Sequence, residues 1–75
     1  MSTTEIKPGD FVIIETEARE LMRMGYSKPE GIEWLLNGEP KGVLRVEPHR
    51  GIYRADRVYV QDMVWVYATM CRRVD

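Results

Sequence analysis

The most informative part of this chain is Asn37-Gly38-Glu39-Pro40-Lys41-Gly42-Val43-Leu44-Arg45-Val46. A turn rich in glycine and proline leads directly into a run of residues that favour β-structure. The same order occurs upstream, where Lys7-Pro8-Gly9-Asp10 precedes the apolar run Phe11-Val12-Ile13-Ile14. Two turns that each open a strand indicate a small β-rich fold.

Short apolar runs alternate with turns after residue 42, which is typical of small β-barrels. The first apolar run predicts a strand at residues 11–15. Its four successive apolar residues suit either a strand that is covered on both faces or one that crosses a tightly curved barrel. Further strands are predicted at residues 43–47, 52–54, 64–67 and 71–74, with one helical turn at residues 68–70. Residues 57–60 either continue the strand at 52–54 or form a separate strand.

Residues 16–37, between the first two strands, have helical character. Residues 17–24 are mostly good helix formers, and Gly25 stands where such a helix would stop. Ser27 and Glu30 have the spacing of a capping box, which predicts a second short helix through residues 34–36. We expect this insert to fold over an open end of the barrel.

The order of these elements resembles that of SH3-like barrels, in particular small proteins of phage and prophage type. The residues that carry the resemblance are Gly9-Asp10-Phe11-Val12, the stretch from Leu35 to Val43, and Val64-Trp65-Val66-Tyr67, within residues 7–74. It implies a five-stranded, mostly antiparallel barrel that binds a partner. KOW-type barrels are similar in placing a glycine before a valine strand, but the acidic first half of this chain departs from their pattern.

Length and composition predict one domain, residues 1–75, with residues 1–6 frayed. No apolar run approaches the roughly 18 residues that span a bilayer, and the N-terminal residues lack the pattern of a signal peptide. The single cysteine, Cys71, excludes an internal disulfide. We therefore expect a cytoplasmic protein with no membrane contact.

Charge is divided unevenly along the chain. Residues 1–40 carry four basic and eight acidic side chains, a net charge of −4, whereas residues 41–75 carry seven basic and four acidic side chains, a net charge of +3. Either the two halves interleave into one balanced surface, or the C-terminal strands build a basic face.

No set of residues has the pattern of a catalytic or metal site. His49 is the only histidine, and it lies in a turn. A general base would need a positioned partner, so we expect this side chain to be solvated. Cys71 and His49 do not have metal-ligand spacing, and Cys71 is expected to be a small apolar filler rather than a reactive thiol. We expect a protein that is not an enzyme and that uses no cofactor or metal.

Aromatic and arginine residues are the candidate binding groups. In residues 57–60 and 64–67, strand alternation places the valines on one face and the aromatic rings on the other. Valine suits a small barrel interior, so the rings would lie outside, with arginines beside them. The predicted binding residues are Trp34, Arg45, Arg54, Arg57, Tyr59, Trp65 and Tyr67.

An exposed cluster of this composition would suit either a protein-binding hot spot or a stacking platform for single-stranded nucleic acid. The alternative is that the insert covers the rings and forms a second small core with Leu21, Met24 and Leu35.

We expect a non-enzymatic protein-binding module, such as a phage-encoded or accessory factor that modulates a host protein. The alternative is a KOW-like barrel that binds nucleic acid through its arginine-rich C-terminal half. Residues 64–67 would also be the centre of a homodimer contact, if the protein pairs to cover its aromatic rings.

Overall fold

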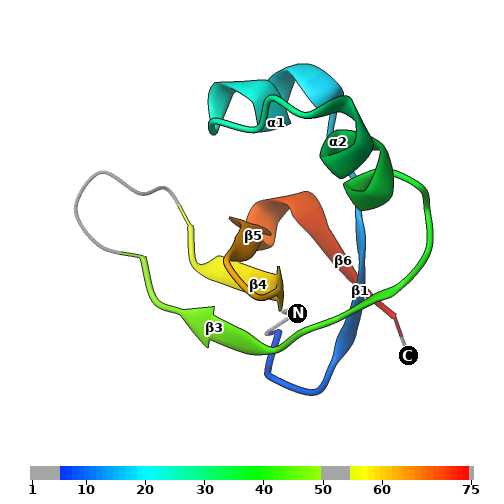
Figure 1. Ribbon diagram of the computed structural model, residues 1–75. Helices are drawn as coiled ribbons and strands as arrows, with labels where there is room; N and C mark the ends of the chain where they lie inside the picture. The colour runs from blue at the N-terminus through cyan, green and yellow to red at the C-terminus, as the bar shows by residue number, and fades with distance from the viewer. Residues whose placement is uncertain (1–5, 50–54, 75) are drawn as a thin grey trace.

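A computed structural model of the chain describes residues 6–49 and 55–74. Two three-stranded antiparallel sheets and two short helices make up these ranges (Figure 1). The strands are β1 (Phe11–Ile14), β2 (Lys41–Gly42), β3 (Arg45–Glu47), β4 (Arg57–Gln61), β5 (Val64–Tyr67) and β6 (Cys71–Val74). The helices are α1 (Ala18–Arg23) and α2 (Pro29–Leu35), and the 3-10 turn η1 (Ala68–Met70) joins β5 to β6. The strand predicted at residues 52–54 lies outside the described residues.

The first sheet has the order β2-β1-β6, with β1 in the centre. The predicted turn precedes β1, and Gly9 adopts a φ of 95° that glycine tolerates without strain. The turn is closed from both sides, because the Asp10 amide donates to the Lys7 carbonyl and the Lys7 amide donates to the Asp10 carboxylate. This turn sets the direction in which β1 enters the sheet.

Strand β1 has only one covered face. Val12 and Ile14 are buried, but Phe11 is exposed and Ile13 is half-buried. Of the two possibilities in the sequence, coverage of both faces is therefore not the one observed. The run is apolar throughout, yet its alternate residues still separate into a core face and an outer face.

The second sheet has the order β3-β4-β5. A register shift between Tyr59 and Gln61 precedes the tight turn that joins β4 to β5. In that turn Met63 has a φ of 66°, which is rare for a residue other than glycine.

The segment predicted as one strand at residues 43–47 divides between the two sheets. Val43 exchanges backbone hydrogen bonds with Gly9 and Asp10, on the side of β1, whereas the Leu44 amide donates to the Tyr59 carbonyl in β4. The chain thus bends out of one sheet and into the other at these two residues. As a result, the described residues form six short strands in two sheets, and the closed five-stranded barrel predicted from the sequence is not seen.

Helix α1 ends in a Schellman motif. Gly25 follows the C-terminal cap with a φ of 111°, and its amide donates to the Met22 carbonyl. The Tyr26 amide donates to the Leu21 carbonyl at 3.1 Å, which closes the motif. The stop predicted at Gly25 is confirmed, and it turns the chain so that Tyr26 points back at the second sheet.

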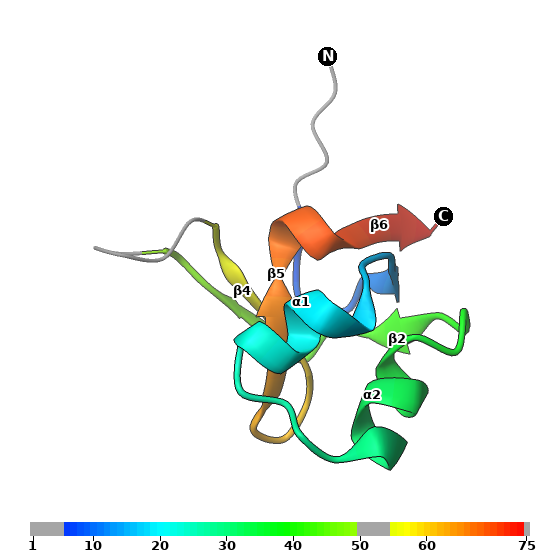
Figure 2. The same cartoon turned by 90° about the horizontal axis from the view of Figure 1, so that it is seen from above.

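Helix α2 begins with Pro29, whose fixed φ suits the first helical turn. Lys28 is its N-terminal cap and makes no side-chain capping bond, so the predicted capping box at Ser27 was wrong. The two helices lie together across one end of the sheets (Figure 1), and the view onto that end shows α1 passing over β5 (Figure 2).

One hydrophobic core joins both sheets and both helices. Leu21 of α1 and Leu35 of α2 are buried in the same cluster as the strand residues Val12, Ile14, Val43, Val58, Val60 and Val66. The insert therefore packs into the main core. It does not form the separate small core that was one of the two possibilities in the sequence.

Candidate binding surface on the second sheet

Six side chains form a two-by-three array on the outer face of the second sheet. Arg45, Tyr59 and Trp65 are register partners across β3, β4 and β5, and Glu47, Arg57 and Tyr67 form the neighbouring row. The row between them, Val46, Val58 and Val66, points to the opposite face, towards the core. We call the six side chains the Arg/aromatic face.

Each arginine of this face lies over an aromatic ring. The guanidinium carbon of Arg45 is 4.1 Å from the centre of the Tyr59 ring, directly across the strand pair. The guanidinium carbon of Arg57 is 4.5 Å from the centre of the Trp65 ring, on the diagonal between β4 and β5. These cation–π contacts hold the two long side chains close to the sheet.

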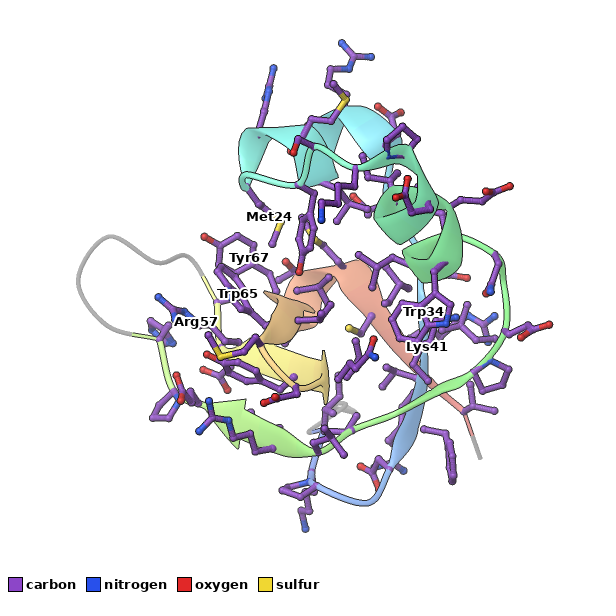
Figure 3. All side chains as sticks on the ribbon, viewed as in Figure 1. Met24, Trp34, Lys41, Arg57, Trp65 and Tyr67 are labelled. Carbon is purple, nitrogen blue, oxygen red and sulfur yellow. The ribbon has the colours of Figure 1, made fainter. Side chains whose placement is uncertain are left out.

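Trp65 and Tyr67 extend the face along β5. Their ring centres are 5.3 Å apart with an interplanar angle of 76°, an edge-to-face arrangement. Figure 3 shows both rings with Arg57 on the side of the sheet away from β1. The prediction that strand alternation separates valines from aromatic rings is confirmed.

Tyr59 departs from the prediction in its exposure. It lies on the outer face, yet only 7% of its surface is accessible. The Arg45 side chain lies over its ring, and Trp65 and Arg45 flank it from the neighbouring strands. Tyr59 therefore supports the arginine and cannot itself be an open contact surface.

Glu47 is the one acidic member of the face. Its carboxylate lies 3.4 Å from Nη1 of Arg45 and 4.0 Å from Nη1 of Arg57, and the Tyr59 hydroxyl donates to it at 3.4 Å. The six residues thus carry a formal charge of +1. Glu47 was not among the residues predicted to bind, although its place two residues after Arg45 in a strand put it on the same face.

Tyr26 holds the outer edge of the second sheet. Its hydroxyl donates to the Trp65 carbonyl at 2.5 Å and accepts from the Trp65 amide at 3.0 Å. Partial burial raises the pKa of this phenol, and the hydrogen bond to the Trp65 backbone opposes that shift in part. The hydroxyl occupies the place of a neighbouring strand, so the backbone groups of β5 at Trp65 are satisfied. No pattern in the sequence points to this contact.

Met24 lies beside the face (Figure 3). It lines two surface cavities. One cavity, of about 430 Å³, lies between α1 and η1 and reaches Tyr67. The other, of about 200 Å³, lies between the Gly25-Tyr26 segment and the β4–β5 turn and reaches Met63 and Trp65. Trp65 and Tyr67 are each half-buried, and each lines one of these two cavities.

Trp34 does not join this surface. It lies on α2, on the far side of the core from Arg57 and Trp65 (Figure 3), and Nζ of Lys41 is 4.8 Å from its ring centre. Lys41 is buried and donates to the Asn37 side chain at 2.7 Å and to the Glu39 carbonyl at 3.0 Å. Trp34 and Lys41 thus close the turn between α2 and β2. Arg54, also predicted to bind, lies outside the described residues.

Two further side chains with reactive groups, His49 and Cys71, lie in local environments of their own. Nδ1 of His49 lies 3.1 Å from the Asp56 carboxylate, and this hydrogen bond lowers the pKa of Asp56. Burial raises the pKa of the Cys71 thiol to about 12, which makes it unreactive. In the described part of the chain, no three His, Cys, Asp or Glu side chains are grouped so that they could hold a metal ion.

Searches of protein-family models, curated proteins and solved structures give no match for this chain. Within the described ranges, no helix has the length and apolar character needed to cross a membrane.

Proposed function

We propose that this chain is a non-enzymatic protein-binding module that docks a partner protein on the Arg/aromatic face. The observation that carries the proposal is the pair of arginines stacked on Tyr59 and Trp65. Because the stacked arginines are already restrained, they lose less side-chain entropy when a partner binds. Arginine, tryptophan and tyrosine are also the residues that contribute most to the energy of protein interfaces.

A protein partner fits this face better than single-stranded nucleic acid does. A stacking platform needs open ring faces on which bases can lie. Here Tyr59 is buried and the Arg57 guanidinium lies over the Trp65 ring. The Glu47 carboxylate would also repel a phosphate backbone at the centre of the face.

We further propose that the two sheets are an open relative of the SH3-like barrel. The order of elements supports this: a first strand, a long insert, three strands joined in sequence, a 3-10 turn and a last strand that pairs with the first. The bend at Val43 and Leu44 would be the place where one barrel strand passes between the two sheets.

The proposal is tested by capture from a cell lysate with the full chain as bait, with and without nuclease. We expect a protein to be captured by the wild type after nuclease treatment and to be lost with Arg45→Gln. The matched control is Arg19→Gln on α1, because both arginines are largely exposed, 58% and 71% of the side chain, and each change removes one positive charge.

Two results would contradict the proposal. If both variants lose the captured protein equally, capture depends on the net charge of the chain and not on the Arg/aromatic face. Recovery of nucleic acid alone, with nothing left after nuclease treatment, would favour the KOW-like alternative, whose affinity should fall steeply with salt.

A further inference from the structure

The Glu47 carboxylate is loosely held among three hydrogen-bond donors. Its distances to the Arg45 and Arg57 nitrogens and to the Tyr59 hydroxyl are 3.4, 4.0 and 3.4 Å. Well-formed bonds between arginine and a carboxylate are shorter, about 2.7–2.9 Å. The Glu47 side chain is also 41% exposed, on an edge strand, so it can turn into solvent without disturbing the core.

The arginines do not depend on Glu47 for their position. Arg45 is held against the Tyr59 ring and Arg57 against the Trp65 ring. If the Glu47 carboxylate left, two oriented guanidinium groups and one phenol hydroxyl would still face the same point. Guanidinium groups bind carboxylates and phosphates, because their planar donors match paired oxygens. A carboxylate fits this point, because that of Glu47 already lies there.

We infer that the point between Arg45 and Arg57 is a subsite for a carboxylate of the partner protein, and that Glu47 occupies it in the free protein as an internal competitor. This inference rests on the proposed function and specifies its partner, a protein segment with an acidic side chain. A neighbouring apolar side chain of that segment would lie on Trp65 and Tyr67. Besides competing with the partner's carboxylate, Glu47 would repel polyanions that cannot displace it from between the two arginines.

The test uses the folded full-length chain and defined probes. The ligand is a terminally blocked tetrapeptide of alternating glutamate and leucine, and its control replaces glutamate with glutamine. Binding is followed by NMR titration of the arginine Nε–H and tryptophan indole signals. Glu47→Gln removes the competing charge at nearly constant shape. Glu39→Gln, in the turn before β2, removes the same charge from an exposed side chain away from the face.

We expect Glu47→Gln to bind the glutamate peptide at least threefold more tightly than the wild type does. Glu39→Gln should bind like the wild type, and the glutamine peptide should bind to none of them. Adding Arg45→Gln to Glu47→Gln should abolish the gain. Glu47→Asp keeps the charge but moves it away from the arginines, so its affinity for the glutamate peptide should rise less. This variant also tests the inference if Glu47→Gln folds poorly.

Equal affinity of the wild type and Glu47→Gln, or no binding of the peptide to any variant, overturns the inference. Equal binding of the glutamine peptide does the same, since no carboxylate would then be recognised. A gain for oligothymidylate without a gain for the peptide would assign the point to phosphate. If the subsite fails while capture of a partner is still lost with Arg45→Gln, the proposed docking surface stands and only the role of Glu47 is wrong.

Discussion

At the scale of single residues, Met63 combines backbone strain with exposure. Its φ of 66° belongs to the left-handed region, which costs a residue other than glycine about 1–2 kcal/mol. Its side chain is 79% exposed, so no burial of its own offsets that cost. Met63 lines the smaller cavity next to Trp65, where a partner on the Arg/aromatic face would cover it.

We predict that Met63→Asn raises stability and weakens binding at the same time. Asparagine tolerates the left-handed region, so the free energy of unfolding should rise by about 0.5 kcal/mol. Partner capture should fall because an apolar contact is lost. Urea denaturation and the capture assay measure the two effects. A variant that loses stability would show that Met63 supports the turn instead.

Cys71 makes the fold sensitive to alkaline conditions. Burial raises the pKa of its thiol from 9.0 to about 12, so above pH 9 the unfolded chain loses this proton while the native chain keeps it. The unfolded state then binds fewer protons, and stability must fall as pH rises, by up to about 1.4 kcal/mol per pH unit. The raised pKa of Tyr26 acts in the same direction.

Urea denaturation at roughly pH 8 and pH 10 checks this pH dependence. Cys71→Ala removes the thiol, so it should be less stable at the lower pH but should lose less stability between the two values. A slope that is the same in the wild type and in this variant would assign the pH dependence to other groups.

At the scale of elements, two glycines in the insert should respond to alanine in opposite ways. Gly25 ends α1 with a φ of 111°, so Gly25→Ala forces a side chain into a strained backbone and should cost about 1 kcal/mol or more. Gly31 lies inside α2 with nothing within 4 Å of the position of an added Cβ. Gly31→Ala should therefore add about 0.5–1 kcal/mol.

Thermal denaturation followed by circular dichroism compares this pair directly. Both changes add one methyl group to the same insert, so each is the control for the other. An unchanged or higher melting temperature for Gly25→Ala would mean that the Schellman motif does not determine where α1 ends, and a lower one for Gly31→Ala would contradict the prediction for α2.

The Tyr26 hydroxyl covers the edge of the second sheet at Trp65. Tyr26→Phe removes the group that bonds both the amide and the carbonyl of Trp65, at a cost of about 2 kcal/mol. The Trp65 amide should then exchange with deuterium faster than its neighbours in β4, and NMR can follow both. Unchanged exchange at Trp65 would show that the contact does not protect the edge of β5.

At the scale of the whole molecule, the insert and the sheets should unfold together, because they share one core. Leu21 of α1 is fully buried, whereas its neighbour Met22 is 60% exposed. Leu21→Ala should cost about 3 kcal/mol, and Met22→Ala should change the free energy of unfolding very little.

Far-UV circular dichroism and tryptophan fluorescence should report the same transition for both variants. The two signals would separate if α1 unfolded on its own, because Trp34 lies on α2, Trp65 lies in β5, and α1 contains no tryptophan. Such a separation would contradict the single core.

Much of the local structure could be read from the sequence. The helix predicted at residues 17–24 is α1, the strand predicted at residues 64–67 is β5, and Gly25 stops its helix. These features depend on residues a few positions apart: the alternation of side chains along a strand and the backbone freedom of glycine. The same alternation predicted which residues of β4 and β5 face the core and which face outwards.

The turns, the alternating strands and the separation of valines from aromatic rings follow from the sequence, because each depends on residues a few positions apart. Three further features are visible only in the folded chain: Glu47 faces both arginines, Tyr26 bonds the Trp65 backbone across 39 positions, and residues 41–47 divide between two sheets. These contacts depend on strand register and on how the insert folds back, which many chains with the same local pattern could arrange differently.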